Sequence, residues 1–529
     1  MSETVRSYTG SGHGPPPRRG GFFARGKMVF LVLVVLLAVY GWWVSRDSYP
    51  IENLIPADQA YQVFAVDILG VRSTLAQSKV LEALPPEAGL GEADALAGDF
   101  GVPAWVLNNL VPNICVVSGK DVRALSDPLV VTRMTRVGCL LMKLHGVLPW
   151  VECETAGGLH LSRIRDAGVY FATRGRALAV SPSRDALIRA LTLRPEDSMT
   201  REAMAGAVRD VSSEDLVGTL SLHPDDPAAS SSMPPLGDAF DKLRFAVRIE
   251  AASLRIKCSG VLRKEWREKF GGFIEELAPV ELMTPPKGIL QVSMNFNKPV
   301  RDLWSVAAQL AGVSDEAEAL WRKWSTPPQD AAPAPVQAAM ALFGQLGPGV
   351  RMSWQGIDLN EMLPVPQIVV TLDADPEALL AVFSALPPLG DGAERYAMQP
   401  QYDAAAKCVR LPLIGGPSME PTAGIIGDTL LVSSSRTVVE ALLNAGGKAE
   451  KLPQPGNLYL TLQPQACAEA LINLAALLAE NSMLKGFTPD RVQHMAAPWL
   501  AGASAVKDIT AFARCKNGEV ILDLAMVCN

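Results

Sequence analysis

The feature that most constrains the fold is a set of sequence matches between the two halves of the chain. The closest pair is GRALAVSPSR at residues 175–184 and GDTLLVSSSR at residues 427–436. Each segment has the pattern of a short strand and then continues into a helical pattern. Matches that recur in the same order along a chain indicate an internal repeat. The sequence therefore predicts two copies of one strand-and-helix unit.

Three further matches occur in the same order as this pair, with spacings that vary as surface insertions would make them. They make Thr132 equivalent to Thr371 and Leu222 equivalent to Leu462, as the closest pair makes Ser181 equivalent to Ser433. The matched segments are IPADQAYQV at 55–63 with TPPKGILQV at 284–292, the 22 residues from Pro128 with those from Pro366, and LSLHP at 220–224 with LTLQP at 460–464.

We therefore predict an α+β protein with two tandem modules, residues 55–284 and 285–529. Alternating strands and local hairpins outnumber continuous apolar runs, which favours a mostly antiparallel sheet with helices on one face. Each module is expected to close with a hairpin, at residues 243–262 and 509–528.

The register of the last hairpin follows from its turn, because Asn517-Gly518 is a favoured two-residue type I′ turn. The register leaves Cys528 opposite Lys507 and places an apolar row on one face, with the other face half solvated. The predicted pairs are Lys516 with Glu519, Cys515 with Val520, Ala513 with Leu522, Ala511 with Leu524 and Ile509 with Met526.

An uncharged apolar run, MVFLVLVVLLAVYGWWV, extends from Met28 to Val44. At about 1.5 Å per residue it is long enough to cross a thin hydrocarbon layer as a helix. Residues 1–27 carry five basic residues and one acid, so the positive-inside rule keeps this tail in the cytoplasm. The sequence predicts a single transmembrane helix at 28–44, a linker at 45–54, and export of everything beyond.

A cleaved signal peptide is the alternative interpretation of this run. Its end offers no small-x-small cleavage site. Tyr40, Trp42 and Trp43 lie instead where amphipathic rings prefer the headgroup layer. These residues favour a retained anchor.

Composition limits the classes of partner. The chain is 49% hydrophobic and 19% charged, which is too apolar for a disordered protein. Removing the +4 charge of residues 1–27 from the total of −7 leaves −11 on residues 28–529. An acidic exported part argues against nucleic acid or anionic lipid as the main partner.

The repeated S-x-S-R motif supports two interpretations. A serine at a strand-to-helix turn is where some hydrolases place their nucleophile. However, no Gly-x-Ser-x-Gly surrounds either motif, and a serine before a helical pattern is typical of an N-cap. We therefore expect Ser183 and Ser435 to cap helices and expect no catalytic residues. The motifs are Ser181, Ser183 and Arg184 in the first half and Ser433, Ser435 and Arg436 in the second.

Cys139, His145, Cys153 and His160 are the one cluster of metal-ligand types. Their spacing, C-x5-H-x7-C-x6-H, lacks the tight pairs that preorganise zinc. Cys139 and His145 would also lie about 120° apart on a helix. We expect no metal and no cofactor.

Eight cysteines in an exported chain could pair in many ways, and the sequence does not choose among them. Cys258, Cys515 and Cys528 fall on apolar strand faces, so burial as small hydrophobic residues also explains them.

A predicted anchor, a Pro-Ala-Asp-x-x-Ala-Tyr start at residues 56–61 and the duplicated G-x-x-L-x-V-S-x-S-R segment together resemble an uncharacterised group of bacterial membrane-anchored extracytoplasmic proteins. The resemblance extends over most of residues 55–529. It implies a location in the bacterial envelope and no known catalytic residues.

These observations predict a non-enzymatic protein of the bacterial inner membrane, with a cytoplasmic N-terminus and a periplasmic bulk that binds or scaffolds an envelope protein or lipid. The alternative is a periplasmic carrier or chaperone for a lipid or another apolar ligand. A carrier would need a continuous apolar cavity or groove between sheet and helices. A third class, an enzyme whose site is assembled only by the fold, has few histidines to draw on.

Overall fold

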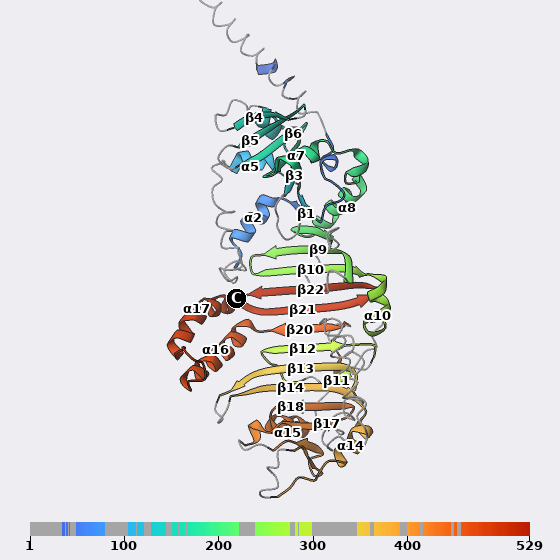
Figure 1. The fold of residues 1–529 in the computed structure, drawn as a ribbon, viewed down its shortest axis with the longest axis vertical. Coiled ribbons are helices and arrows are strands. Elements are labelled where there is room, and N and C mark those ends of the chain that lie inside the picture. The colour runs from blue at the N-terminus through green and yellow to red at the C-terminus, as the bar shows by residue number, and fades with distance from the viewer. Residues whose placement is uncertain are drawn as a thin grey trace, which may run out of the picture.

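The structure is a computed structural model, and it describes residues 34–36, 39–40, 42, 49–79, 104–112, 114–120, 128–143, 151–156, 158–164, 168–221, 239–275, 281–283, 285–298, 346–359, 364–391, 399–412, 416–445, 449–451 and 456–529. Its main feature is one long antiparallel sheet of 20 strands with helices packed against it (Figure 1). The predicted α+β class and the antiparallel sheet are confirmed.

The first half of the chain contributes ten strands to this sheet. They run in the order β4-β5-β6-β7-β3-β2-β1-β8-β9-β10 from the outer edge inward. The strands are β1 (Tyr61–Val66), β2 (Ile114–Gly119), β3 (Leu129–Arg133), β4 (Val151–Ala156), β5 (Leu159–Ile164), β6 (Val169–Arg174), β7 (Ala177–Ser181), β8 (Leu216–Ser221), β9 (Phe240–Glu250) and β10 (Ser253–Leu262).

The second half contributes the other ten strands: β12 (Leu290–Asn295), β13 (Leu346–Asp358), β14 (Val365–Ala374), β15 (Gln401–Asp403), β16 (Cys408–Arg410), β17 (Thr422–Ile426), β18 (Thr429–Ser433), β20 (Leu458–Leu462), β21 (Val506–Lys516) and β22 (Glu519–Cys528). From the outer edge inward their order is β15-β16-β17-β18-β14-β13-β12-β20-β21-β22. This order repeats that of the first half, strand for strand. A separate two-stranded sheet pairs β11 (Glu281–Met283) with β19 (Ala449–Lys451).

The ladder also assigns equivalent residues to the two halves. Gln62 pairs with Ser118 on β2 and Thr219 on β8. Gln291 likewise pairs with a serine on β13 and a threonine on β20, Ser353 and Thr461. In both halves the glutamine amide donates a hydrogen bond to the carbonyl of a preceding proline, Pro56 or Pro286.

The halves join in the middle of the sheet, where β10 pairs with β22. The residue pairings can be followed strand by strand from β1 to β10 in the first half and from β12 to β22 in the second. They show that Lys257 on β10 and Asp523 on β22 occupy equivalent positions. These two residues are also paired with each other. An approximate twofold axis therefore passes between them.

Two of the predicted equivalences need correction. Counted along the ladder from Ser181 and Ser433, the residue equivalent to Thr371 is Val131, one place from Thr132. Leu222 lies outside the described residues, and the ladder places Leu220 at the position of Leu462. A shift of one residue turns a side chain to the opposite face of a sheet, so matching letters in Leu-rich and Val-rich strands does not determine the register.

Both predicted closing hairpins are present, as β9 with β10 and β21 with β22. All five predicted pairs of the last hairpin, from Lys516 with Glu519 to Ile509 with Met526, are confirmed. The prediction for Cys528 is wrong, because the register shifts between Val506 and Asp508 and places Cys528 opposite Val506. A bulge of this kind adds one unpaired residue to a strand, and the turn sequence carries no sign of it.

The largest core lies in the first half, beneath the helices η1 (Ile51–Leu54), α7 (Arg184–Leu191) and α8 (Arg201–Val211). Leu54, Val116, Val131 and Leu187 are completely buried there. The linker predicted at 45–54 includes η1, which buries Ile51 and Leu54 in this core. The other described helices of this half are α2 (Ile68–Ala76), α5 (Ala104–Leu110), α6 (Arg136–Lys143), η5 (Pro195–Asp197) and α10 (Lys264–Ile274).

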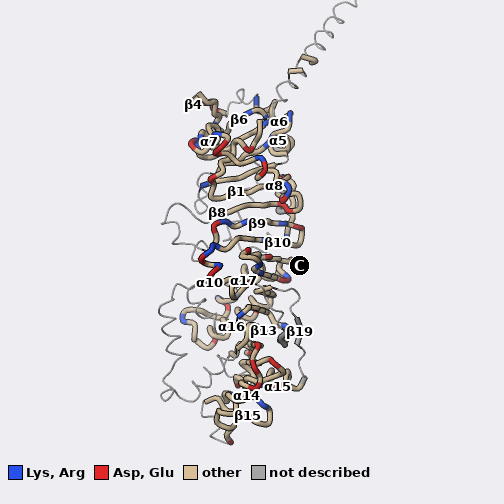
Figure 2. Tube along the Cα trace, turned by 90° about the vertical axis from the view of Figure 1, so that its right-hand side faces the viewer, with Lys and Arg blue, Asp and Glu red and all other residues tan. Residues whose placement is uncertain are grey.

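The second half has two smaller cores, beneath α14 (Pro376–Ser384) and α15 (Arg436–Ala445). A short helix, η8 (Pro417–Met419), precedes β17. Figure 2 shows the long, narrow outline of the molecule, with basic and acidic residues distributed along it.

A helical hairpin, α16 (Pro464–Glu480) with α17 (Pro489–Ala505), stands out from one side of the sheet beyond the strand ends (Figure 1). Proline at the first position of each helix and Thr488 as the N-cap of α17 fix where the helices start. The hairpin connects β20 to β21, at the place where residues 222–238 connect β8 to β9.

Of the predicted membrane segment, the structure describes residues 34–36, 39–40 and 42, all in helical conformation. Within the described residues, no helix is long and apolar enough to cross a membrane. The transmembrane helix at 28–44 stays a prediction.

Candidate functional site

The serine motif of the first half lies at the end of β7. Ser181 is fully buried, and its hydroxyl accepts a hydrogen bond from the Ser183 amide at 3.1 Å. The Ser183 hydroxyl accepts from the Ala186 amide at 3.4 Å, which makes Ser183 the N-cap of α7. The capping prediction is confirmed at this position.

The motif of the second half has the same backbone arrangement but a different contact at its second serine. Ser433 accepts from the Ser435 amide at 3.2 Å, as Ser181 does from Ser183. The Ser435 hydroxyl, however, lies 2.7 Å from the Thr437 hydroxyl. The capping prediction for Ser435 is therefore wrong, because a hydroxyl neighbour takes the place of the backbone donor.

The described histidines lie away from both motifs. His160 Nδ1 is 3.5 Å from the Thr155 hydroxyl, and His494 lies on α17. His13, His145 and His223 lie outside the described residues.

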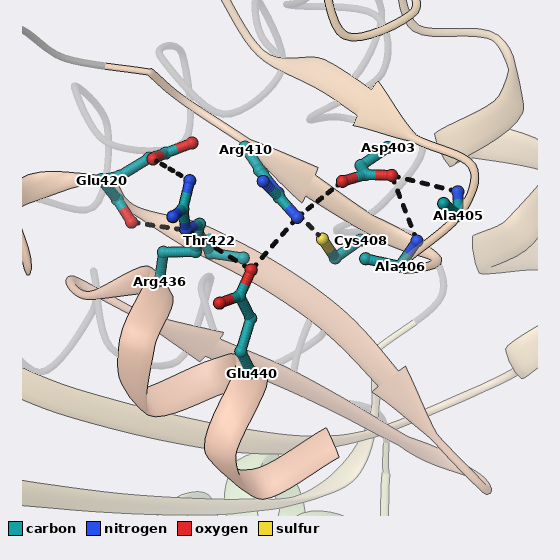
Figure 3. A network of polar contacts seen from close by, with 9 residues as sticks. All are labelled: Asp403, Ala405, Ala406, Cys408, Arg410, Glu420, Thr422, Arg436 and Glu440. Carbon is teal, nitrogen blue, oxygen red and sulfur yellow. Dashed lines mark hydrogen bonds and ion pairs between the residues drawn. The ribbon is translucent and has the colours of Figure 1, made fainter. Parts of the chain in front are cut away.

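Behind the second motif, the structure brings together a buried network of charged residues that the sequence analysis missed (Figure 3). Arg410 on β16 contacts Asp403 Oδ2 at 2.5 Å and Glu440 Oε1 at 3.2 Å. Arg436 contacts Glu420 Oε2 at 3.1 Å and Glu440 Oε1 at 3.4 Å. Glu440 thus joins the two arginines, and we name these five residues the charge network.

The charge network is largely shielded from water. Arg410 is 8% exposed and Glu420 is 4% exposed. Asp403 also accepts hydrogen bonds from the amides of Ala405 and Ala406. Buried charges of this kind are tolerated only when they are paired and hydrogen-bonded.

The pKa of Arg410 reflects the balance within the network. Burial lowers it, but the hydrogen bond to Cys408 and the charges of Asp403 and Glu440 together raise it above its usual value. Burial also raises the pKa of the Cys408 thiol, whose Sγ lies 3.4 Å from Arg410 Nε. Arg410 is therefore charged at physiological pH and Cys408 is a protonated thiol, which makes this cysteine a poor nucleophile.

Only part of this network has a signal in the sequence. Arg436 and Glu440 are four residues apart on a helical pattern, a spacing at which opposite charges meet. Asp403, Arg410 and Glu420 come from three separate segments. The strand order brings them together, and no spacing in the sequence predicts it.

Of the residues of metal-ligand type, Cys139 lies on α6, whereas Cys153 and His160 lie on the paired strands β4 and β5. Cys139 is 2% exposed in a core with Met134 and Phe171, and its Sγ lies 3.3 Å from the Gly175 carbonyl. Cys153 is exposed on β4, at the edge of the sheet, and His145 lies outside the described residues. Among the described residues, no group of three or more His, Cys, Asp and Glu is placed to hold a metal ion.

Five of the eight cysteines are buried: Cys115, Cys139, Cys408, Cys515 and Cys528. Burial raises the pKa of the Cys115 thiol to about 11. Such thiols behave as small hydrophobic side chains.

The apolar face of the central strands is the remaining candidate site. Each end of this face is closed by a small core, one around Val506 and Met526 and one around Phe240 and Leu262. Between them lies a strip of apolar side chains that are only half-buried, which we name the middle strip. It consists of Ile256, Cys258, Ala511, Ala513, Leu522 and Leu524.

No protein-family model matches the chain, and no curated protein sequence matches it. Among solved structures, the chain is similar to crystal form IV of TP0453, with 7% identity and a TM-score of 0.25 over 40% of this chain and 81% of that one. Crystal form I gives 7% and 0.25 over 42% and 81%, and crystal form III gives 7% and 0.24 over 42% and 86%. At these TM-scores the likeness carries no argument about fold or function.

Proposed function

We propose that this chain is a membrane-anchored envelope protein whose long sheet is a binding or scaffolding surface, without catalysis. In this proposal residues 28–44 hold it in the bacterial inner membrane, with the N-terminus cytoplasmic and the bulk in the periplasm. The observation that carries the proposal is the central sheet. It presents a polar face and, behind it, an apolar face that is only half-buried at the middle strip.

The polar face supports a macromolecular partner. Arg244 and Arg248 on β9 and Arg514 on β21 are exposed on the central strands. Arg255 pairs with Asp523, and Lys257 Nζ lies 3.0 Å from Glu214 Oε1. Charges of both signs on a flat surface select a partner by complementarity.

The partner is tested by photo-crosslinking in living cells. A photoreactive amino acid at Arg248 or Arg514 in the full chain is expected to trap one reproducible envelope protein, identified by mass spectrometry. The same amino acid at Asp185, an exposed position on α7 away from the central sheet, is the control. Identical adducts at all three positions would contradict the proposal.

The anchor is tested separately. A reporter enzyme that functions only in the periplasm is expected to be active when it is fused after Asn529, and one that functions only in the cytoplasm is expected to be inactive there. The chain is also expected to resist extraction from membranes by alkaline carbonate. A chain released with a new N-terminus near Ser45 would support the signal-peptide alternative.

Within this proposal, residues 55–284 and 285–529 are two copies of one module. The repeated strand order, the Gln62 and Gln291 rows and the pairing of Lys257 with Asp523 support it. An experimental structure of the full chain is expected to superpose the halves with Ser181 on Ser433. A different register in the second half would contradict the duplication.

The middle strip favours one second candidate, a carrier or chaperone for a lipid or another apolar ligand. The side chains of the middle strip are less buried than those of the two cores beside it. Apolar surface that keeps some exposure is what a hydrocarbon chain covers.

A pair of adjacent variants tests this candidate. Leu524→Asp places a charge on the apolar face, whereas Ala525→Asp places the same charge on the polar face. The full chain is purified from membranes solubilised without detergent, and the amount of lipid that copurifies is measured. This amount is expected to fall in the Leu524→Asp variant and to stay unchanged in the Ala525→Asp variant. Equal lipid in both variants would exclude the carrier function.

A further inference from the structure

Exposed apolar side chains are concentrated on the hairpin of α16 and α17. Outside residues 34–42, nine large apolar side chains of the described residues are exposed, and five of them lie on this hairpin. They are Leu471, Met483, Phe487, Met495 and Trp499. Met483 is 62% exposed and Trp499 is 58% exposed. Such a concentration marks an interaction surface, whereas single exposed apolar residues do not.

The spacing of these residues places them on one side of α17. Arg491, Met495 and Trp499 recur every four residues on α17, and residues four apart lie on one helical face. Phe487 precedes the helix and lies against Arg491. The Arg491 guanidinium lies 5.2 Å from the Phe487 ring centroid, and its Nη1 donates to the Gly486 carbonyl at 3.0 Å. Arg491 is thereby held beside the apolar stripe.

The tip of the hairpin, residues 481–488, adds two more features. It carries Met483 and Phe487 together with the exposed Lys485. Residues 481–491 contain two bases, Lys485 and Arg491, and one acid, Asp490, so this segment is positive although the chain has a net charge of −7. Positive charge next to exposed apolar and Trp side chains is the composition that fits a phospholipid headgroup layer.

The position of the tip fits the same partner. Helix α17 runs directly into β21 at Val506, so the tip lies at the far end of a 17-residue helix. Such a helix is about 25 Å long. Figure 1 shows the hairpin projecting past the strand ends, on a side where its outer face is uncovered by other described elements.

The predicted anchor would keep a bilayer within reach. Tyr49, the first residue of the described body, follows Val44 by five residues, which span at most about 18 Å. A short tether raises the effective concentration of the membrane at the protein surface.

We propose that the tip of the α16 and α17 hairpin, together with the exposed side of α17 that follows it, docks on the surface of the phospholipid bilayer, with Met483, Phe487, Met495 and Trp499 entering the headgroup layer. The proposal rests on the proposed membrane location. Docking at this second point would orient the long sheet relative to the membrane, since a single tether leaves a body free to rotate.

Site-specific photo-crosslinking in the full chain tests the docking. Phe487→benzoylphenylalanine and Met495→benzoylphenylalanine are expected to form adducts with phospholipid in cell membranes. Val261→benzoylphenylalanine is the matched control, because Val261 is 62% exposed but lies on β10 of the central sheet. Adducts with a second copy of the chain or with another protein, or no adducts beyond those of the control, would overturn the proposal.

A second measurement separates this proposal from the anchor. Carbonate extraction is performed on the same membranes, and the purified chain is also mixed with vesicles of equal parts phosphatidylethanolamine and phosphatidylglycerol. If the chain resists extraction but Phe487 gives no lipid adduct, the docking is wrong and the anchor stands. If the chain is extracted but its tip labels lipid in added vesicles, the anchor is wrong and the docking stands.

A variant gives the functional readout. The double variant Met483→Ser and Phe487→Ser changes two residues of an exposed loop. It is therefore expected to leave the unfolding temperature unchanged. It should abolish the lipid adduct formed from Met495→benzoylphenylalanine. An undiminished adduct would overturn the role of the tip.

Discussion

The two halves of the sheet differ at the corner behind β7 and β18, where the backbone is the same and the chemistry is not. In the first half Arg184 pairs with Glu154 at 2.6 Å, and both side chains are more than 40% exposed. In the second half the equivalent Arg436 belongs to the buried charge network. One backbone arrangement thus supports either a solvated ion pair or a buried network.

The difference arises from three substitutions at equivalent positions. Ile188 of α7 is replaced by Glu440 of α15, and Gly168 is replaced by Glu420. Tyr170, whose ring lies 5.5 Å from the Arg163 guanidinium, is replaced by the smaller Thr422. The second half has two additional carboxylates and less aromatic volume. Its arginines therefore form ion pairs with carboxylates, whereas Arg163 of the first half contacts an aromatic ring.

The largest expected effect is at the charge network. Arg410→Ala leaves Asp403, whose side chain is 15% exposed, without its ion partner, while Glu440 keeps its contact with Arg436. Removing one member of a buried ion pair typically destabilises a protein by about 3–5 kcal/mol, and we expect a loss in this range in chemical unfolding.

Arg163→Ala is the control in the first half, because Arg163 occupies the equivalent position and contacts a ring. A cation over an aromatic ring contributes about 0.5–2 kcal/mol. Equal losses in the two variants would show that the charge network is not what distinguishes the second half.

The next prediction compares the cores beneath α7 and α15. Leu187 and Val439 are equivalent positions and both are 0% exposed. Leu187→Ala is expected to lower the free energy of unfolding by about 2–5 kcal/mol, because it opens a cavity in a close-packed core.

Val439→Ala removes fewer atoms from a smaller core and should cost less in the same measurement. A larger loss at Val439 would mean that the second half, not the first, carries most of the stability of the sheet.

The serine motifs give a smaller difference. Ser183→Ala removes a helix cap, which typically costs about 0.5–2 kcal/mol. Ser435→Ala removes a contact with Thr437 and should cost less. Thermal unfolding of both variants measures this difference, and a greater loss at Ser435 would contradict the assignment of the cap.

The smallest effect concerns pH. The hairpins β6–β7 and β17–β18 turn at equivalent glycines, Gly175 and Gly427, which have φ values of 58° and 55°. A like charge lies near a titratable group beside each turn. Arg133 lies near Arg176 beside the first turn, and Asp428 lies near Asp373 beside the second. Burial and the charge of Asp428 raise the pKa of Asp373, and burial and Arg133 lower the pKa of Arg176.

A raised pKa means that the folded state binds its proton more tightly than the unfolded state. This contribution to stability is complete below about pH 3.9, the usual pKa of an aspartate, and is lost as the pH rises through the raised value. Asp373→Asn removes the titration, so it should raise the unfolding temperature at neutral pH relative to the unmodified protein, with a smaller difference in acid.

Arg133→Gln is the control, since arginine does not titrate in this range and its effect should not change between acid and neutral pH. A gain from Asp373→Asn that is the same at both pH values would show that Asp373 has no raised pKa.

Local signals predicted local structure well. The Asn517-Gly518 turn predicted five residue pairs of the last hairpin, and the S-x-S-R motif predicted the cap at Ser183. The same signals failed where a neighbour decided the outcome, as at Ser435, where Thr437 takes the hydroxyl, and at Cys528, where a bulge shifts the register.

The charge network was not predictable in this way. Asp403, Arg410 and Glu420 belong to short strands and turns that carry no periodic pattern. Their convergence depends on β15, β16 and β17 stacking beside β18, which is a property of strand order.

The sequence by itself determined the elements whose information is contained within a few residues: the alternating strands, the α+β class, the closing hairpins and the apolar run from Met28 to Val44. Turn residues and side-chain periodicity act over such short ranges, so they can be recognised without knowing the fold. Only the tertiary structure decided that β10 pairs with β22, that the charge network forms in one half, and that the α16 and α17 hairpin leaves its apolar stripe uncovered. These features depend on contacts between segments far apart in the chain, where register and packing select the partners.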